Sequence, residues 1–212
     1  MNKFHSHTDD PVLNRLRTYF SRSGAKIPAG IPHSDPEINA RTLARRHELR
    51  EAAVLIPVVK PSHLSPSQII LTVRSSNLSS HAGQISLPGG SRAPQDADII
   101  TTALRESAEE IGIRMEDVEV LGSLGEIMLP SGFRVTPVIG LLPSDLQLTP
   151  CPIEVNEIFL APSSLLLDPT AYKISSWNYE NRQLRIFELN YQHYRIWGAT
   201  AAILQHLASE IA

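Results

Sequence analysis

The sequence predicts an α+β fold in which a mixed β-sheet lies between helices. Short apolar runs of strand length and longer amphipathic stretches of helix length both occur along the 212-residue chain. They mix without the strict strand–helix–strand alternation of a purely parallel sheet. The length fits one domain with an added segment, and we find no internal repeat. We expect a helical arm and linker over residues 1–45 and the main domain over residues 46–212.

The N-terminal arm is predicted to begin with a helix over residues 9–22. Asp10 can cap this helix, and Pro11 suits its first turn. Residues 23–36 are rich in proline, glycine and serine, which is typical of a connecting segment. A basic helix is expected over residues 40–50. The apolar side chains that share one face of the first helix are Val12, Leu13, Leu16, Tyr19 and Phe20.

The main domain is predicted to start with a buried strand, because residues 51–60 form a continuous apolar run. The prolines and glycines of residues 86–98 break regular structure. A helix follows from about Asp98 to Ile111. The other expected elements are strands at residues 67–76, 118–127 and 133–142, a strand leading into a short helix at 157–166, two strands joined by a turn at 183–198, and a closing amphipathic helix at 199–212.

Composition excludes several classes of protein. Hydrophobic residues make up 42% of the chain and the formal net charge is −3, which fits neither a disordered tail nor a strongly basic nucleic-acid binder. Cys151 is the single cysteine, so no internal disulfide can form and a reducing compartment is expected. The N-terminal stretch lacks the apolar core of a signal peptide, and no apolar run approaches the roughly 18 residues of a membrane span. We expect a cytoplasmic protein with neither nucleic-acid nor membrane partners.

The stretch "TALRESAEEIGI" sets three acids on one side of the predicted helix. Glu106, Glu109 and Glu110 occupy positions i, i+3 and i+4, which are neighbours on a helix surface. Like charges at this spacing cost roughly 0.2–0.5 kcal/mol per pair. Gly112 is a plausible cap at the C-terminal end, where acids also oppose the helix dipole. A divalent cation with hard oxygen ligands would relieve this repulsion, whereas the alternative is a solvated acidic face with Arg105 as a surface partner.

A glycine pair precedes this helix and makes the metal interpretation more specific. Gly89 and Gly90 let backbone approach a ligand closely or let the chain turn tightly. Either feature alone has an ordinary structural explanation, as a loop or as a charged surface. The combination of glycine loop and acidic helix is more specific than either one.

The stretch from Gly89 to Ile113 resembles the Nudix box, whose core is Arg-Glu-x-x-Glu-Glu-x-Gly after a glycine loop. The loop is one residue longer than in the general box, and the acidic position before the arginine falls on Ala97, between Asp96 and Asp98. The coenzyme A pyrophosphatase branch of the family shares this longer loop. The residues that match the core are Arg105, Glu106, Glu109, Glu110 and Gly112.

That branch also carries a signature upstream of the glycine loop. Here Leu87 stands where an aromatic residue is usual, Ser79 where an arginine is common, and Ala93 where an acid is frequent. The resemblance covers roughly residues 50–205 and implies an α/β/α sandwich, so the main domain at 46–212 is identified as a Nudix hydrolase domain. The upstream positions that fit the signature are Leu71, Thr72, Arg74, Ser75, His81, Gly83, Pro88, Gly89 and Gly90.

The resemblance implies a metal-dependent hydrolase that cleaves the diphosphate of coenzyme A or its acyl derivatives. The products would be adenosine 3′,5′-bisphosphate and 4′-phosphopantetheine, and the cofactor Mg²⁺ or Mn²⁺. Because the chain is slightly acidic, the cations must supply positive charge for the anionic substrate locally. A homodimer is compatible with the sequence. The open alternatives are a Nudix enzyme acting on ADP-ribose, NADH or nucleoside triphosphates, and a non-catalytic Nudix sensor.

Roles within the site follow from the same comparison. Glu106 and Glu110 are expected to be the main metal ligands, and Glu109 a further ligand or the holder of a water. Arg105 completes the catalytic set by fixing a metal-binding glutamate. The residues expected at the substrate are Arg74, His81, Gly89 and Gly90, with Arg92 as a further phosphate contact.

Several assignments stay open at the level of sequence. No motif in the sequence identifies the general base, and its candidates are Glu126, Glu154 and Glu157. Aromatic side chains that could stack on adenine or pack structurally are Trp177, Trp197 and Tyr191. Cys151 lies in no nucleophile motif and is interpreted as structural.

Overall fold

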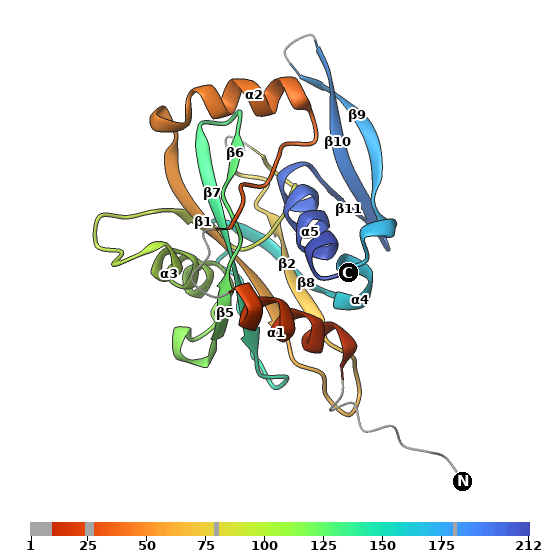
Figure 1. The fold of residues 1–212 in the computed structure, drawn as a ribbon. Helices are drawn as coiled ribbons and strands as arrows, with labels where there is room; N and C mark the ends of the chain where they lie inside the picture. The colour runs from red at the N-terminus through yellow and green to blue at the C-terminus, as the bar shows by residue number, and fades with distance from the viewer. Residues whose placement is uncertain (1–9, 24–27, 79–80, 180–181) are drawn as a thin grey trace.

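A mixed β-sheet forms the centre of the protein (Figure 1). The computed structural model describes residues 10–23, 28–78, 81–179 and 182–212. Within them the sheet has eight strands: β1 (Arg50–Val59), β2 (Gln68–Arg74), β3 (Ile85–Ser86), β4 (Gly89–Ser91), β5 (Glu119–Ser123), β6 (Ile127–Leu129), β7 (Phe133–Leu142) and β8 (Val155–Pro162). The path runs β3-β2-β1-β7-β5, while β4, β6 and β8 pair with β1, β7 and β2. The β1–β7 pair is parallel and the other pairs are antiparallel.

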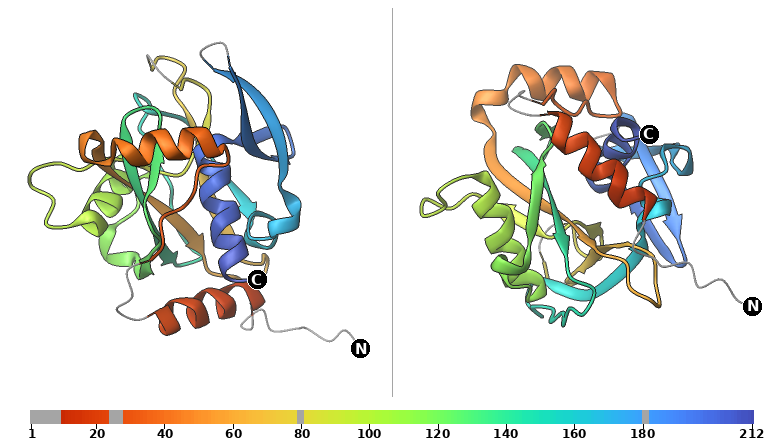
Figure 2. Two further views of the ribbon diagram at one scale, coloured as in Figure 1. Left: turned by 45° about the horizontal axis from the view of Figure 1, so that its top comes forward. Right: turned by 60° about the horizontal axis from the view of Figure 1, so that its bottom comes forward.

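Helices cover both faces of this sheet (Figure 2). Leu55 of β1 belongs to an apolar cluster with Ile111, on α3, whereas its neighbour Ile56 belongs to a second cluster with Leu204, on α5. Because successive side chains of a strand point to opposite faces, α3 and α5 lie on opposite sides of β1. This layering confirms the predicted α+β fold with a mixed sheet between helices. The helices are α1 (Pro11–Ser23), α2 (Pro36–Ala44), α3 (Ile99–Ile111), α4 (Ser163–Leu166) and α5 (Gly198–Glu210), with 3₁₀ turns at Arg46–Glu48, Met115–Asp117 and Pro169–Ala171.

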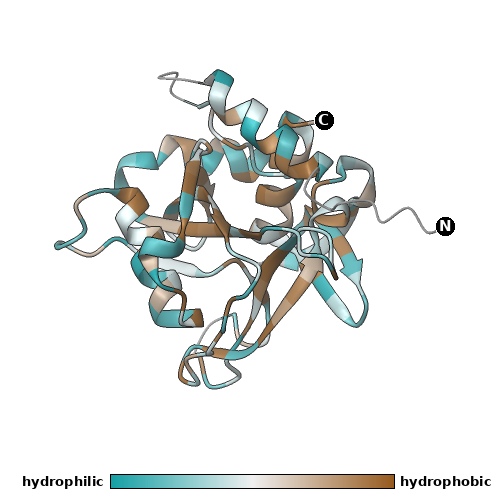
Figure 3. Cartoon of the chain, turned by 90° about the horizontal axis from the view of Figure 1, so that it is seen from below, coloured by the Kyte–Doolittle hydropathy of each residue, from teal (hydrophilic) through white to brown (hydrophobic). Residues whose placement is uncertain are grey.

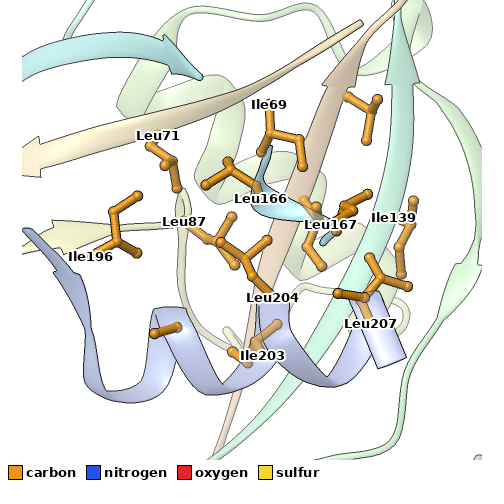
Figure 4. Packing of buried hydrophobic residues seen from close by; sticks show 14 of the residues in the cluster. Ile69, Leu71, Leu87, Ile139, Leu166, Leu167, Ile196, Ile203, Leu204 and Leu207 are labelled. Atoms are coloured by element: carbon orange, nitrogen blue, oxygen red, sulfur yellow. The ribbon is translucent and has the colours of Figure 1, made fainter. Parts of the chain in front are cut away.

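The larger core lies between the sheet and α5 (Figure 4). Ile69 and Leu71 of β2 and Ile139 of β7 face Leu204 and Leu207 of α5 there. Hydrophobic residues concentrate along the strands and on the inner faces of the helices (Figure 3). No helix in the described ranges is both long and apolar enough to cross a membrane.

The N-terminal helix forms as the sequence predicts. Asp10 accepts hydrogen bonds from the backbone N–H groups of Val12 (2.9 Å) and Leu13 (3.1 Å), so it caps α1. Its second carboxylate oxygen accepts from the N–H of Ser67 at 3.0 Å, which ties the cap to the start of β2. Val12, Leu13 and Leu16 are buried in the larger core. Residue 9, the start of the predicted range, lies outside the described residues.

The predicted basic helix at residues 40–50 has the wrong bounds. The helix α2 begins at Pro36, inside the stretch expected to be a connector, and ends at Ala44. Asp35 caps it by accepting from the N–H groups of Glu37 (3.0 Å) and Ile38 (3.2 Å), and proline suits the first helical position. Arg50 already belongs to β1.

The expected strand at residues 118–127 is also divided in two. β5 ends at Ser123 and β6 begins at Ile127. Between them, a Cβ atom on Gly125 would lie 1.9 Å from the carbonyl oxygen of Ala29, so the N-terminal arm crosses tightly over this break. The short strands β3 and β4 likewise replace irregular chain that was expected near residues 86–98.

A second, three-stranded sheet packs beside α5. It contains β9 (Lys173–Tyr179), β10 (Arg182–Tyr191) and β11 (Tyr194–Trp197), in the order β11-β10-β9. The two predicted strands at residues 183–198 are confirmed as β10 and β11, whereas β9 was not expected. The predicted strand and short helix at 157–166 are confirmed as β8 and α4.

Candidate active site

The helix α3 presents its three glutamates in different environments. Asp98 caps its start by accepting from the N–H of Thr101 at 2.7 Å, and Gly112 ends it with a left-handed φ of 73°. Ala103 and Ile111 anchor one side of the helix in the smaller core. The acids lie on the flank of this buried side, so their exposure is graded. Glu110 is 3% exposed, and the side chains of Glu106 and Glu109 are 16% and 60% exposed.

Arg105 holds the acidic groups together. Its Nε and Nη2 donate to the two carboxylate oxygens of Asp96 at 2.8 and 3.0 Å. The same guanidinium donates to Glu106 (3.0 Å), to Glu109 (3.0 Å) and to the carbonyl oxygen of Ser91 (3.2 Å). Such forked pairing is stronger and more directional than a simple surface ion pair. Arg105 therefore fixes the carboxylate of Glu106 relative to the strand β4.

Asp96 is the acid that pairs with Arg105. The acidic position of the general pattern falls on Ala97, and of the acids on either side of it Asp96 bonds to the guanidinium. Its side chain is 1% exposed and also accepts from the N–H of Ala93 (2.8 Å) and the hydroxyl of Thr102 (2.9 Å). The guanidinium of Arg105 holds the pKa of Asp96 far below its usual range. The path of the loop brings Asp96 back to Arg105. Because the loop is longer than in the general pattern, sequence spacing alone does not predict this path.

The glycine loop lies directly against the acids. The N–H of Gly89 donates to Oε2 of Glu110 at 3.2 Å. A Cβ atom on Gly90 would lie 2.4 Å from Oε2 of Glu106, and one on Gly89 would lie 2.3 Å from the carbonyl oxygen of Ala53. Gly89 therefore requires glycine because backbone lies too close for a side chain, whereas a side chain at Gly90 would displace the Glu106 carboxylate. The structure brings Gly89, Gly90, Glu106 and Glu110 together.

Burial disfavours the charged form of Glu110 more than that of Glu106. Desolvation raises its pKa to about 7, while the Gly89 N–H and the charge of Arg74 act in the opposite direction. Burial also raises the pKa of Glu106, against the effect of Arg105. The negative charge of Glu154 acts on both glutamates, so this third carboxylate lies within electrostatic reach of the pair.

Backbone hydrogen bonds explain the position of Glu154. Its carbonyl oxygen accepts from the N–H of Ser75 at 2.8 Å, and its N–H donates to Cys151 at 3.0 Å. The N–H of Cys151 donates in turn to the carbonyl oxygen of Glu110 at 2.9 Å. The turn at residues 151–154 is thereby fixed to both α3 and the end of β2.

The other two candidates for the general base have different partners. Glu126 accepts from Arg46 (2.8 Å) and Arg134 (3.0 Å), and Glu157 accepts from the hydroxyl of Tyr194 (2.6 Å). Neither glutamate is among the main causes of the pKa shifts of Glu106 and Glu110. Among the three candidates, Glu154 is the one connected to the cluster.

The expected substrate residues separate into two groups. Arg74 ends β2 near Glu110, and its buried Nε has no hydrogen-bond partner among the described residues. His81 is exposed, with a φ of 58°, and its Nδ1 lies 3.0 Å from Oε1 of Gln84. No contact between described residues links His81 to the carboxylates. Ser79 lies outside the described residues.

The aromatic candidates lie in the small sheet. The rings of Trp177 and Trp197 are 5.2 Å apart, and Tyr191 packs at the edge of the larger core. These contacts lie within the small sheet and at the larger core. Cys151 has a free, partly buried thiol, while its backbone joins the turn to α3.

The donor set fits a hard divalent cation. In the described part of the chain, no three His, Cys, Asp or Glu side chains stand close enough together to hold a metal. Arg105 pairs with Glu106 and Glu109, and Gly89 donates to Glu110. Even so, Glu110 is a buried carboxylate with a raised pKa and one backbone donor. Carboxylate oxygens are the ligands that Mg²⁺ and Mn²⁺ prefer, so a cation would satisfy what the protein leaves unsatisfied.

Comparison with known proteins establishes the family. The NUDIX domain model matches residues 49–174. A protein from Photorhabdus laumondii, named uncharacterized Nudix hydrolase NudL, is 42% identical over 163 residues, which cover 76% of this chain and 85% of that protein. A NudL from Citrobacter koseri is 40% identical over 176 residues, covering 83% of this chain and 88% of that protein. Among solved structures, the Nudix hydrolase RenU from M. smegmatis is 23% identical, covers 54% of this chain and 71% of its own, and has a TM-score of 0.46. The chain that carries this carboxylate cluster therefore belongs to the Nudix hydrolases.

Proposed function

We propose that this Nudix hydrolase cleaves the diphosphate linkage of coenzyme A or acyl-coenzyme A. The products are adenosine 3′,5′-bisphosphate and 4′-phosphopantetheine or its acyl derivative. The observation that carries the proposal is the signature from Leu71 to Gly90. That signature begins in β2, includes Arg74 near Glu110, and ends at the glycines that contact the acids. Groups in this position can recognise what is attached to a diphosphate held beside α3.

Each residue of the site has a separate role in the proposed reaction. Glu106 and Glu110 would hold Mg²⁺ or Mn²⁺ as the main ligands, and Glu109 would be a further ligand or hold a water. When bound, such a cation would supply positive charge to the diphosphate and lower the pKa of a water. Arg105 is a positioning residue, because its fork to Asp96 keeps the Glu106 carboxylate beside the glycine loop. Gly89 and Gly90 leave room for the substrate's phosphates, and Arg74 faces their charge.

We assign Glu154 the role of general base. Its carboxylate accepts a proton from the attacking water as the water oxygen bonds to phosphorus, and the anhydride P–O bond breaks with its electron pair leaving on the departing phosphate. Glu154→Gln should lower kcat by on the order of 10²-fold and remove the acidic limb of the pH–rate profile. Glu157→Gln is the matched control, because that carboxylate pairs with Tyr194 instead. Equal effects of the two substitutions would contradict the assignment.

We also propose where the enzyme acts and in what form. The lone cysteine and the slightly acidic composition support a place in the cytoplasm. There the protein acts on a small molecule as a monomer or homodimer. Residues 1–45 serve as an arm to the hydrolase domain at 46–212.

A metal-dependent substrate panel tests the function. Coenzyme A, dephospho-coenzyme A, ADP-ribose, NADH and nucleoside triphosphates are each incubated with Mg²⁺ or Mn²⁺, and products are identified by mass spectrometry. We expect a kcat/KM for coenzyme A at least roughly tenfold above those for dephospho-coenzyme A and ADP-ribose, about 1.4 kcal/mol of preference. Faster cleavage of ADP-ribose or a triphosphate would overturn the coenzyme A assignment. Absence of any turnover would favour a sensor.

A further inference from the structure

An open cleft of about 600 Å³ begins where the glycine loop ends. It is lined by Arg50 and Glu51 of β1 and by residues 91–94. The pairing of β1 with β4 sets Ser91 opposite Ala52, so the cleft continues the same edge that carries Gly90. The carbonyl oxygen of Ser91, which lines the cleft, accepts from Arg105 at 3.2 Å, so the cleft adjoins the acidic cluster of α3. Residues 92–94 belong to the loop that projects before that helix (Figure 1).

Positive charge is in excess around this cleft. Glu51 accepts from Arg92 (2.9 Å) and Arg134 (2.6 Å). Arg134 and Arg46 also share Glu126, at 3.0 and 2.8 Å. Together with Arg50, four arginines meet two glutamates here, whereas the chain as a whole carries a net charge of −3. This end of the sheet therefore attracts anions although the protein as a whole does not.

Arg50 is the arginine whose charge is not matched. Its guanidinium lies 4.2 Å from the centre of the Phe133 ring, and no carboxylate pairs with it in the described ranges. Stacking on an aromatic ring orients a guanidinium while leaving its N–H groups available. Arg92 donates to Glu51 through one terminal nitrogen. Ser91 is exposed and lines the same cleft.

A purely structural ion network does not explain this arrangement. Arg46 and Arg134 satisfy Glu126, and Arg92 and Arg134 satisfy Glu51, so the network is complete without Arg50. Arg50 and Arg92 line the cleft. Two further acids lie close by. Asp96 accepts from the N–H of Ala93 but is paired with Arg105. The pKa of Asp98 is lowered mainly by hydrogen bonds at the start of α3 and in small part by Arg92.

We propose that Arg50 and Arg92, with Ser91, form a subsite for a phosphate monoester on the substrate's sugar. Resting on the proposed function, this group is the 3′-phosphate of the adenosine half of coenzyme A. Arg74 precedes Ser75, whose N–H bonds to the turn that is fixed to Glu110, so Arg74 lies on the side of the acids. The second phosphate, across the ribose, is left to the arginine cleft. A guanidinium fork suits a phosphate dianion by geometry as well as by charge.

Arg50→Gln tests the subsite with substrates that differ by one phosphate. We expect kcat/KM for coenzyme A to fall about tenfold and that for dephospho-coenzyme A to stay within about twofold. Arg50→Lys should retain part of the preference because the charge remains. Arg46→Gln is the matched control, because it removes one charge from the same network but does not line the cleft. An equal loss on both substrates, or a similar effect of Arg46→Gln, would overturn the subsite.

Calorimetric binding separates this proposal from the proposed function. Adenosine 3′,5′-bisphosphate and AMP differ by the 3′-phosphate alone and require no turnover. We expect the wild type to bind the bisphosphate about tenfold more tightly and Arg50→Gln to lose that difference. Equal affinity in the wild type rules out the subsite whatever the substrate proves to be. A coenzyme A preference that survives Arg50→Gln would overturn the subsite and leave the proposed function intact.

Discussion

Glu110→Gln should stabilise the metal-free protein above neutral pH while removing its response to metal. The carboxylate is 3% exposed, accepts one backbone N–H, and faces the charges of Glu154 and Glu106. Glutamine keeps the size of the side chain and an oxygen for the Gly89 N–H. It removes the negative charge that burial disfavours.

The magnitude follows from the shift in pKa. Burial raises the pKa of Glu110 from 4.5 to about 7. Below pH 4.5 the folded and unfolded states both carry the proton, so the carboxyl group has no effect on stability. As the pH rises from 4.5 to 7, the folded state keeps a proton that the unfolded state releases, and the free energy of unfolding falls. Above pH 7 the cost levels off at about 3 kcal/mol.

Urea denaturation in EDTA at pH 5 and pH 8 measures this difference. At pH 5 the wild type and Glu110→Gln should have similar free energies of unfolding. At pH 8 the variant should be more stable by about 1–3 kcal/mol, because the amide's unpaired N–H groups offset part of the gain. Glu109→Gln is the control, since that carboxylate is 60% exposed, and it should change stability by less than about 1 kcal/mol at either pH.

Adding millimolar Mg²⁺ or Mn²⁺ at pH 8 completes the experiment. The melting temperature of the wild type should rise, because a cation that binds the folded state alone stabilises it. The melting temperature of Glu110→Gln should respond far less. The reasoning is refuted if the variant is no more stable than the wild type in EDTA at pH 8. It is equally refuted if cations stabilise the two proteins to the same extent.

Three further substitutions test the catalytic geometry. In saturating metal, Glu110→Gln should lower kcat by on the order of 10²-fold, about 3 kcal/mol, and wild-type turnover would end the ligand assignment. Gly90→Ala should lower kcat at least about tenfold, because its Cβ would lie 2.4 Å from the Glu106 carboxylate, whereas Gly30→Ala, with its nearest contact at 3.4 Å, should be neutral. Asp96→Asn should lower kcat more than it raises KM by loosening the arginine that it holds; a change in KM alone would argue against a positioning role.

Elements with strong local signals could be predicted from the sequence. The caps predicted at Asp10 and Gly112 mark helix ends by side-chain chemistry or by a left-handed conformation, and both formed. The helix predicted to start at about Asp98 begins at Ile99, with Asp98 as its cap. The start of α2 was missed although Asp35 and Pro36 carry the same kind of signal, because the surrounding prolines favoured a connector. The short strands β3 and β4 had no local signal, since their pairing with β2 and β1 is what makes them strands.

The residues of the site also fall into a group that local sequence patterns predict and a group that they do not. The i, i+4 spacing on one helix predicts that Glu106 and Glu110 lie side by side. In the structure both lie against the glycine loop. Residues contributed by loops could not be located by spacing. Asp96 reaches Arg105 through a turn one residue longer than the general pattern, and Glu154 reaches α3 through backbone bonds of the turn after Cys151. Long-range packing decides both positions, so a pattern within one segment does not contain them.

The acids around α3 carry more negative charge than the nearby arginines offset, so a diphosphate would need bound cations in order to bind there. Arg105 pairs with the carboxylates of Asp96, Glu106 and Glu109, and the charges of Glu106 and Glu154 both act on Glu110. Among the described residues, Arg105 already donates to three of these acids, and the charge of Arg74 acts on Glu110. A diphosphate adds further negative charge, so its approach is unfavourable until bound cations reverse the local sign. The arginine cleft beyond the glycine loop offers the opposite environment. A substrate with a second phosphate there would gain attraction at one end while metal supplies it at the other.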